Sequence, residues 1–153
     1  MRIQEIIPPE AVVDGLLSET KEGILRELSE AICRRLPALS PDRLTSILMD
    51  REGLGSTGIG EGVAIPHGKI PGIDRIFAVF GRSRGGVQFA SLDGKPARLF
   101  FLILAPENSA GMHLKALARI SRLLKDQRFR GRLLAAEGAE GLSQVLREED
   151  ERV

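Results

Sequence analysis

Residues 98–105 read RLFFLILA, one arginine followed by seven apolar residues, and this stretch decides the class of the fold. A run that is apolar at every position and bounded by turn-forming residues is typical of a β-strand covered on both faces. We therefore place it near the centre of a sheet. Two shorter apolar runs, VAIPH at 63–67 and IFAVFGR at 76–82, predict neighbouring strands. The stretch SRGGVQFASLDGKP at 83–96 predicts a hairpin or crossover loop with a short edge strand around residues 87–89.

Amphipathic helices are predicted before these strands. Residues 20–36 place apolar side chains on one face of a helix and oppositely charged side chains four residues apart on the other. Ser40 is a favourable N-cap and Pro41 suits a first helical position, so a second helix should run to about residue 52. That helix would bring Arg51 to the glycine-rich stretch that follows it.

More helices are predicted after the strands. A third helix should begin near Ser109, because leucine and isoleucine recur at helical spacing up to residue 124. Shorter helical pieces follow at 128–137 and 141–150, and the acidic end at 148–153 is predicted to be a frayed terminus. Helices before and after a block of strands favour a layered α/β fold, and residues 1–153 are expected to form a single domain.

The composition restricts the classes of function. The chain has 22 Lys and Arg against 21 Asp and Glu, a balance that argues against general electrostatic binding to nucleic acid or to anionic membranes. Its one cysteine, Cys33, can form no internal disulfide, and the longest apolar run is far too short to span a bilayer. We expect a cytoplasmic protein that is not inserted in a membrane.

A second informative stretch is GSTGIGEGVAIPHGK at 55–69, in which four glycines precede His67, one of only two histidines. Glycines allow the chain to turn through positive φ, and they also allow backbone N–H groups to approach an anion closely. The N–H groups of residues 56–62 are therefore candidate donors to a phosphoryl group, with Arg51 and Lys69 as candidate positive charges.

Other interpretations of this stretch fit less well. Residues 53–58 match G-x-G-x-x-G, but a dinucleotide-binding fingerprint needs a strand before the glycines and a helix after them, and here the predicted order is reversed. A P-loop would need Lys-Ser or Lys-Thr after the last glycine, and no such pair follows. His67 and His113 have no third metal ligand at a recognisable spacing, and no G-x-S-x-G marks a nucleophilic serine.

His67 itself could carry out chemistry. A neutral imidazole is a competent nucleophile near pH 7, because its ordinary pKa is close to that value, and it can hold a covalent group. Phosphoryl transfer suits such a residue, since the reaction depends on in-line positioning and on positive charge around the phosphoryl oxygens. From the residues alone, a purely structural role for His67 is an equally good interpretation.

The stretch REGLGSTGIGEGVAIPHGK at 51–69 resembles the active-site motif of the IIA domains of the fructose–mannitol class in the bacterial phosphoenolpyruvate:sugar phosphotransferase system. The later run PENSAGMHLKALARISRLL at 106–124 resembles the second signature of that family, and the similarity covers essentially the whole chain. Within the class, the GSTGIG motif and the chain length resemble those of the nitrogen-regulatory branch. The resemblance implies a mixed five-stranded sheet flanked by helices on both faces, and neither a metal nor an organic cofactor.

The resemblance also implies roles for individual residues. His67 is the expected phosphoryl acceptor, loaded from a phosphohistidine on a small HPr-like carrier. Arg51 is expected to steady the phosphoryl group, and His113 to line the same site, with an ordinary helix-start position as its alternative. The expected supporting residues of the glycine-rich loop are Ser56, Thr57, Gly58 and Gly60. For the two hydroxyl side chains among them, local capping of the loop is an equally good interpretation.

Three functions remain open at this stage. A nitrogen-type IIA protein implies signalling, in which phosphorylation alters binding to a target such as a sensor kinase or transporter. The target is expected to dock on an apolar patch around His67 that includes Ile59, Val63 and Ile65. A sugar-type IIA component would pass its phosphate to a IIB protein, and a pure binding module would have an inert His67. The basic segment 115–132 is expected to be a solvated face balanced by the acidic C-terminus, with an acidic partner as the alternative.

Overall fold

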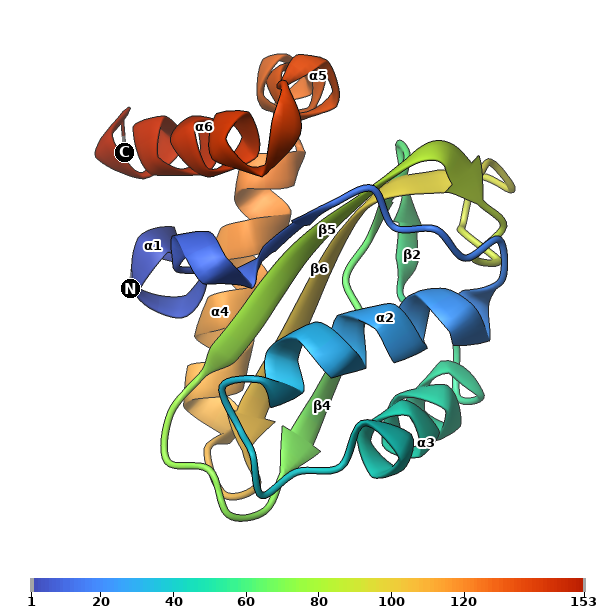
Figure 1. The fold of residues 1–153 in the computed structure, drawn as a ribbon, viewed down its shortest axis with the longest axis vertical. Helices are drawn as coiled ribbons and strands as arrows, with labels where there is room; N and C mark the ends of the chain where they lie inside the picture. Colours follow the sequence, from blue (N-terminus) through green and yellow to red (C-terminus); the bar gives the residue numbers. More distant parts are fainter. Residues whose placement is uncertain (1, 153) are drawn as a thin grey trace.

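The computed structural model describes residues 2–152, and it confirms a layered α/β fold with a mixed sheet flanked by helices (Figure 1). Among these residues the helices are α1 (Ile3–Ile6), α2 (Lys21–Cys33), α3 (Pro41–Glu52), α4 (Ala110–Leu124), α5 (Gln127–Ala135) and α6 (Gly138–Arg152), with a 3-10 turn η1 (Pro9–Ala11). The strands are β1 (Val12–Asp14), β2 (Gly58–Gly60), β3 (Val63–Ala64), β4 (His67–Ile70), β5 (Phe77–Val87) and β6 (Ala97–Pro106).

β6 is the central strand, as RLFFLILA predicts. It pairs with antiparallel β5 on one side and with parallel β3 and β4 on the other, while β1 and β2 form the edges. Residues 99–105 are at most 1% exposed, so both faces of the strand are covered. β3 and β4 pair with successive parts of β6, Val63 with Leu99 and His67 with Ile103. The six strands therefore occupy five positions across the sheet.

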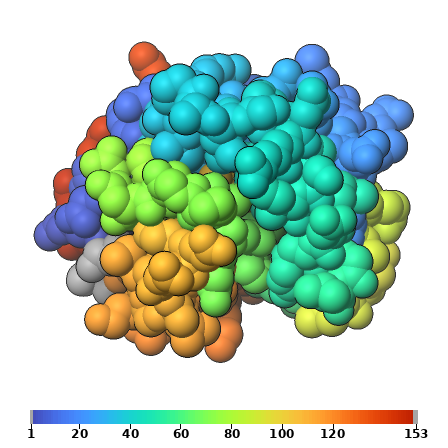
Figure 2. Space-filling view, turned by 90° about the horizontal axis from the view of Figure 1, so that it is seen from below, coloured from blue at the N-terminus to red at the C-terminus, as the bar shows by residue number. Residues whose placement is uncertain are grey.

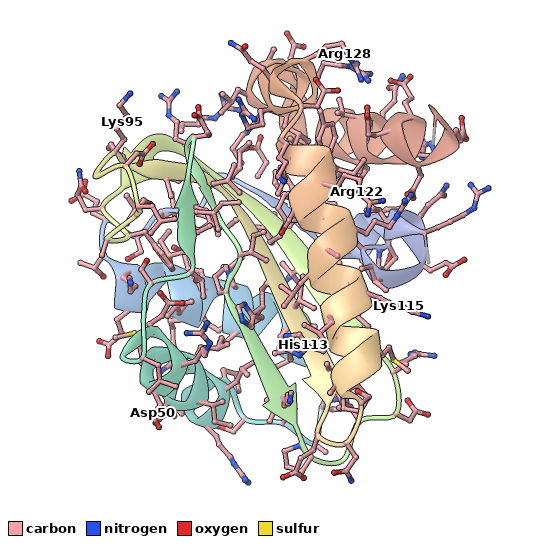
Figure 3. All side chains as sticks on the ribbon, turned by 180° about the vertical axis from the view of Figure 1, so that it is seen from behind. Asp50, Lys95, His113, Lys115, Arg122 and Arg128 are labelled. Carbon is pink, nitrogen blue, oxygen red and sulfur yellow. The ribbon has the colours of Figure 1, made fainter. Side chains whose placement is uncertain are left out.

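Helices cover both faces of this sheet. Figure 1 shows α2 and α3 in front of it, and Figure 3, seen from behind, shows α4 lying across the opposite face. The predicted starts of α2 and α3 are confirmed: the Thr20 hydroxyl accepts from the Gly23 amide at 3.1 Å, and the Ser40 hydroxyl accepts from the Arg43 amide at 3.3 Å. Side-chain caps of this kind satisfy amides that have no partner within the helix.

The predicted edge strand at residues 87–89 is wrong. β5 continues to Val87, its register against β6 shifts between Arg82 and Val87, and residues 88–90 lie outside any strand. Gly86 has a φ of +80°, a conformation that glycine adopts at little cost, so the glycines deform β5 instead of ending it. Phe89 is fully buried against Phe100, which explains the apolar residue in this loop.

The predicted frayed terminus at 148–153 is also wrong for residues 148–152, because α6 continues to Arg152; Val153 lies outside the described residues. The Asp150 carboxylate is buried and accepts hydrogen bonds from the Ile3 and Gln4 amides, both at 2.8 Å, at the start of α1. It also forms an ion pair with Arg119 at 3.2 Å. A carboxylate at a helix N-terminus satisfies otherwise unpaired amides and favours the helix dipole. The acidic end is therefore part of the folded structure.

The same acidic residues balance the basic segment, as expected. Arg128 pairs with Glu149 at 3.0 Å, and Arg132 pairs with Glu148. Across residues 2–152, no helix is both long and apolar enough to cross a membrane.

Candidate active site

His67 lies where the strand beside β6 is interrupted. The sequence VAIPH predicts one strand, but the chain leaves β3 at Ala64 and resumes ladder pairing only at His67, the first residue of β4. Pro66 has no backbone N–H to donate, yet its carbonyl accepts from the Ile103 amide at 2.9 Å and keeps both segments beside β6. The proline thus breaks the strand without displacing it, and it places His67 at the start of a new segment.

The ring of His67 is held by the backbone of its own chain. Its Nδ1 lies 2.7 Å from the carbonyl oxygen of Ile65. A carbonyl can only accept a hydrogen bond, so in the neutral ring the proton is on Nδ1 and the lone pair is on Nε2. Burial lowers the pKa of His67 and outweighs the Ile65 hydrogen bond, which raises it; the charge of Arg51 lowers the pKa further, and the charge of Glu52 raises it by less. The imidazole is therefore kept neutral near pH 7, as a nucleophile requires.

His113 reaches His67 from α4, the helix that covers the face of the sheet opposite to α2 and α3. It lies in the N-terminal part of α4, where its amide donates to the Ser109 carbonyl at 3.0 Å, and its side chain is buried. The two imidazole ring centroids are 5.2 Å apart and nearly perpendicular, at 81°. Burial lowers the pKa of His113 most, followed by the influence of His67, Lys69 and Arg51. Its Nδ1 is buried without a hydrogen-bond partner among the described residues.

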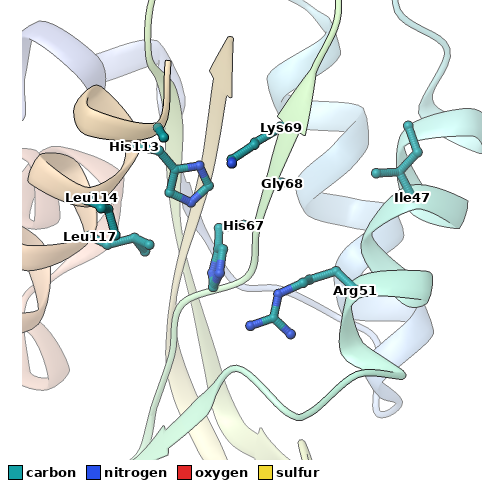
Figure 4. A pocket seen from close by; sticks show the side chains of 9 residues that line it. Ile47, Arg51, His67, Gly68, Lys69, His113, Leu114 and Leu117 are labelled. Atoms are coloured by element: carbon teal, nitrogen blue, oxygen red, sulfur yellow. The ribbon is translucent and has the colours of Figure 1, made fainter. Parts of the chain in front are cut away.

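Two cationic side chains complete the group around His67. Arg51 lies in the last turn of α3, and its Nη1 donates to the Gly55 carbonyl at 3.0 Å. Lys69 lies two residues after His67 on β4, and alternation along a strand puts both side chains on the same face. Figure 4 shows His67 between His113 on one side and Arg51 on the other, with the amine of Lys69 near His113.

These four side chains line one cavity of about 490 Å³. Figure 2 shows the face on which it opens, where the start of α4 (orange), β4 with its following loop (green) and α3 (teal) surround a hollow. The other lining residues are Gly68 and four apolar ones, Ile47, Ala110, Leu114 and Leu117. The cavity thus combines two imidazoles and two cationic side chains with an apolar wall, an arrangement that favours an anionic group.

The loop residues expected to support a phosphoryl group are not among the residues that line this cavity. Ser56 Oγ donates to the Phe89 carbonyl at 2.5 Å and accepts from the Gly58 amide at 3.0 Å. The Thr57 hydroxyl and amide both donate to Glu52. Gly60 belongs to β2 and has a φ of +93°. In this structure the polar groups of Ser56, Thr57 and the Gly58 amide hold the loop itself, as in the capping interpretation.

The expected apolar patch is partly wrong. Val63 and Ile65 are buried, since they lie in or beside the strand that pairs with β6, and only Ile59 is exposed. The apolar wall of the cavity comes instead from α3 and α4, through side chains such as Ile47 and Leu114. The most useful missed feature is the Ile65 carbonyl, because a backbone group has no signature in a sequence. Within residues 2–152, no cluster of three or more His, Cys, Asp or Glu side chains could hold a metal ion.

Comparison with known proteins identifies the family of this chain. Residues 5–149 match the family described as "Phosphoenolpyruvate-dependent sugar phosphotransferase system, EIIA 2". The chain is 42% identical over 146 residues to a nitrogen regulatory protein of Bradyrhizobium diazoefficiens, covering 95% of each chain. It is 34% identical over 150 residues to the fructose-specific EIIABC component of Bacillus subtilis, covering 98% of this chain and 24% of that protein.

Among solved structures, the nitrogen regulatory protein IIA-Ntr from Neisseria meningitidis superposes with a TM-score of 0.87 and 35% identity, covering 94% of this chain and 98% of that one. The sequence match and the fold agree with one another. The chain belongs to the EIIA type 2 family of the phosphoenolpyruvate-dependent sugar phosphotransferase system.

Proposed function

We propose that this chain is a regulatory IIA protein of the nitrogen type, which acts in the cytoplasm and accepts a phosphoryl group on Nε2 of His67 from an HPr-like phosphocarrier. The observation that carries the proposal is the hydrogen bond between His67 Nδ1 and the Ile65 carbonyl, 2.7 Å long, in a cavity that also holds Arg51, Lys69 and His113. It fixes the ring as the tautomer whose Nε2 can attack, and the two cations favour an anionic group beside it.

The transfer step is a displacement at phosphorus. The lone pair on Nε2 of His67 forms the new N–P bond as the N–P bond of the carrier's phosphohistidine breaks, and the electron pair of that bond returns to the carrier's imidazole. The His67 ring becomes cationic as the bond forms, while its Nδ1–H remains on the Ile65 carbonyl. That hydrogen bond strengthens as the ring gains charge, so it stabilises the transition state more than the ground state.

Neighbouring side chains act on the phosphoryl oxygens. The guanidinium of Arg51 supplies a planar fork of donors, and Lys69 adds a second positive charge. In His113 we assign the proton to Nε2, because its Nδ1 is buried without a partner and an unpaired N–H there would be costly. The Nε2–H of His113 is then a donor to a phosphoryl oxygen, and His113 is a supporting residue instead of an acceptor of the group.

A labelling experiment tests the acceptor. The protein is incubated with phosphoenolpyruvate, the first enzyme of the system and an HPr-type carrier, and the bound phosphate is followed with time. Wild type should take up one acid-labile, base-stable phosphoryl group, His67→Ala none, and His113→Ala one group at a reduced rate with the label on His67. Normal labelling of His67→Ala, or label on His113, would overturn the assignment.

The regulatory part of the proposal is supported by the nitrogen-type relatives, which this chain matches over nearly their whole length. A phosphoryl group adds up to two negative charges beside an apolar wall. A target that docks by covering Ile47 and Leu114 would have to desolvate that charge, so a sensor kinase or transporter should bind the unphosphorylated form more tightly.

Affinity measurements separate regulation from sugar transport. Partners recovered from a native lysate are titrated with phosphorylated wild type, unphosphorylated wild type and His67→Ala, which we expect to match the unphosphorylated protein. The fructose-specific relative defines the alternative, a IIA component that passes its phosphate to a sugar-specific IIB protein. Equal affinities in all three forms, together with efficient transfer to such a IIB protein, would establish that alternative.

A further inference from the structure

Glu52, the last residue of α3, has a buried carboxylate that the transfer step does not use. Its side chain is 3% exposed. Oε1 accepts from the Lys21 ammonium at 2.8 Å and from the Thr57 amide at 3.1 Å, and Oε2 accepts from the Thr57 hydroxyl. A buried carboxylate with donors on both oxygens is compensated for its lost hydration, and a fully bonded buried group rigidifies the elements that it joins.

The segments that Glu52 joins are the end of α3 and the far end of loop 53–57. Neighbouring residues on a helix point about 100° apart, so Arg51 can reach the cavity while Glu52 bonds beneath the loop. The Gly55 carbonyl, in the middle of this loop, is the acceptor that holds Arg51 Nη1 at 3.0 Å. The position of that carbonyl, and with it the direction of the guanidinium, depends on the closure of the loop by Glu52 and Thr57.

Lys21 neutralises the carboxylate of Glu52, which lies close to the cationic residues of the cavity. Its ammonium pairs with Glu52 and lies 4.5 Å from the centroid of the Phe89 ring, so it is held on both sides. The donors from Lys21 and Thr57 occupy the carboxylate, and Glu52 therefore does not compete with a phosphoryl group for Arg51. An unpaired carboxylate at this position would draw the guanidinium away from the cavity.

We propose that Glu52 is a positioning residue for phosphoryl transfer: it fixes loop 53–57, and through the Gly55 carbonyl it holds the Arg51 guanidinium toward the cavity. This inference rests on the proposed function, in which Arg51 stabilises the transferred group. The sequence marks Glu52 only as one more charged residue at the end of a helix, and the structure identifies its partners.

A double-mutant cycle tests this role. Transfer rates from a phosphorylated HPr-type carrier are measured for wild type, Glu52→Gln, Arg51→Ala and the double variant. Glutamine keeps the size of the side chain and removes the charge and one acceptor oxygen. Glu52→Gln should slow transfer about tenfold, less than the roughly 10² expected for Arg51→Ala. With Arg51 already replaced, Glu52→Gln should cause no further loss; a full tenfold loss in that background would overturn the inference, since independent effects multiply.

Two further variants keep the test sharp. Thr57→Val removes only the hydroxyl donor, retains the branched shape and should slow transfer as Glu52→Gln does. If Glu52→Gln does not fold, Thr57→Val replaces it in the double-mutant cycle with Arg51→Ala. Glu30→Gln makes the same chemical change at an exposed position of α2 and should transfer at the wild-type rate. If His67→Ala is labelled, the proposed function fails. If His67 is labelled and both Glu52→Gln and Thr57→Val transfer at the wild-type rate, only the positioning role fails.

Discussion

At the scale of single residues, the site depends on burial and nearby positive charge, both of which keep the two histidines neutral. Both histidines have their pKa lowered chiefly by burial, and the nearby cations add to that effect, so the site holds neutral rings beside fixed positive charge. His67, His113 and Arg51 could be proposed from the sequence because their motifs resemble a known family. The tautomer of His67 could not, since the Ile65 carbonyl that fixes it is a backbone group placed by the break at Pro66.

Arg51 can be tested at this scale. Arg51→Ala should slow phosphoryl transfer by roughly 10² without unfolding the protein, because it removes a preorganised positive charge from a half-buried position at a helix end. Arg51→Lys should restore only part of the rate, since a point charge replaces a planar fork. Rapid-quench measurement of the transfer rate gives the comparison, with circular dichroism as the check on folding. Transfer at the wild-type rate in Arg51→Ala would show that Arg51 takes no part in the transfer step and is only a residue at the end of α3.

At the scale of elements, hydrophobic periodicity and capping residues predict the long helices and the central strand well. The same signals fail to predict short or interrupted elements. α3 begins where Ser40 and Pro41 indicate and ends at Glu52, as expected, and β6 is covered on both faces. The strands β1 and β2 have only three residues each, too few to show a period, and tertiary pairing alone defines them. The stretch 83–96 does connect antiparallel β5 and β6, but the edge strand predicted within it is wrong, because a glycine bulge that lengthens β5 looks in sequence like a turn between two strands.

Gly58 provides a prediction for the glycine-rich segment. A Cβ added there would lie 2.4 Å from Ser91 Oγ and 3.0 Å from Ser91 Cα, so the backbone would have to shift. Gly58→Ala should therefore destabilise the fold by about 1–3 kcal/mol. Gly131→Ala is the matched control: it lies within α5 with open space around the added carbon, and it should stabilise by about 0.5–1 kcal/mol. Urea unfolding measures both, and an unchanged midpoint for Gly58→Ala would show that the contact is not restrictive.

At the scale of the whole molecule, the two ends of the chain are fastened together. Asp150 of α6 caps α1 and pairs with Arg119 of α4, so the N-terminal helix, the C-terminal helix and the helix that carries His113 share one buried carboxylate. The sequence could show the acidic residues but not their partners, because the Ile3 amide lies 147 residues from Asp150 and Arg119 lies 31 residues from it. The cavity is likewise a property of the whole fold, since α3, β4 and α4 each contribute to it.

The lowered pKa values of both histidines predict how stability depends on pH. Unfolded histidine titrates near pH 6.5, so below that pH the unfolded chain binds protons that the folded one resists, and stability is lost as the pH falls. Carboxyls with a lowered pKa, such as those of Asp14 and Asp93, contribute only at lower pH, since their ordinary value is 3.8. Between about pH 6.5 and 5, wild type should lose stability, and His67→Gln/His113→Gln should lose much less. Denaturant unfolding across this range gives both slopes, and equal slopes would contradict the explanation.

The central claim is that Nε2 of His67 receives the phosphoryl group while Nδ1 stays on the Ile65 carbonyl. The most direct measurement is a long-range ¹H–¹⁵N spectrum of the ¹⁵N-labelled protein before and after phosphorylation by an HPr-type carrier, which distinguishes the two ring nitrogens. We predict a protonated Nδ1 in both states, with the phosphoryl group on Nε2 of His67 and both nitrogens of His113 free of phosphorus. Phosphorylation of His67 Nδ1, or of His113, would contradict the account.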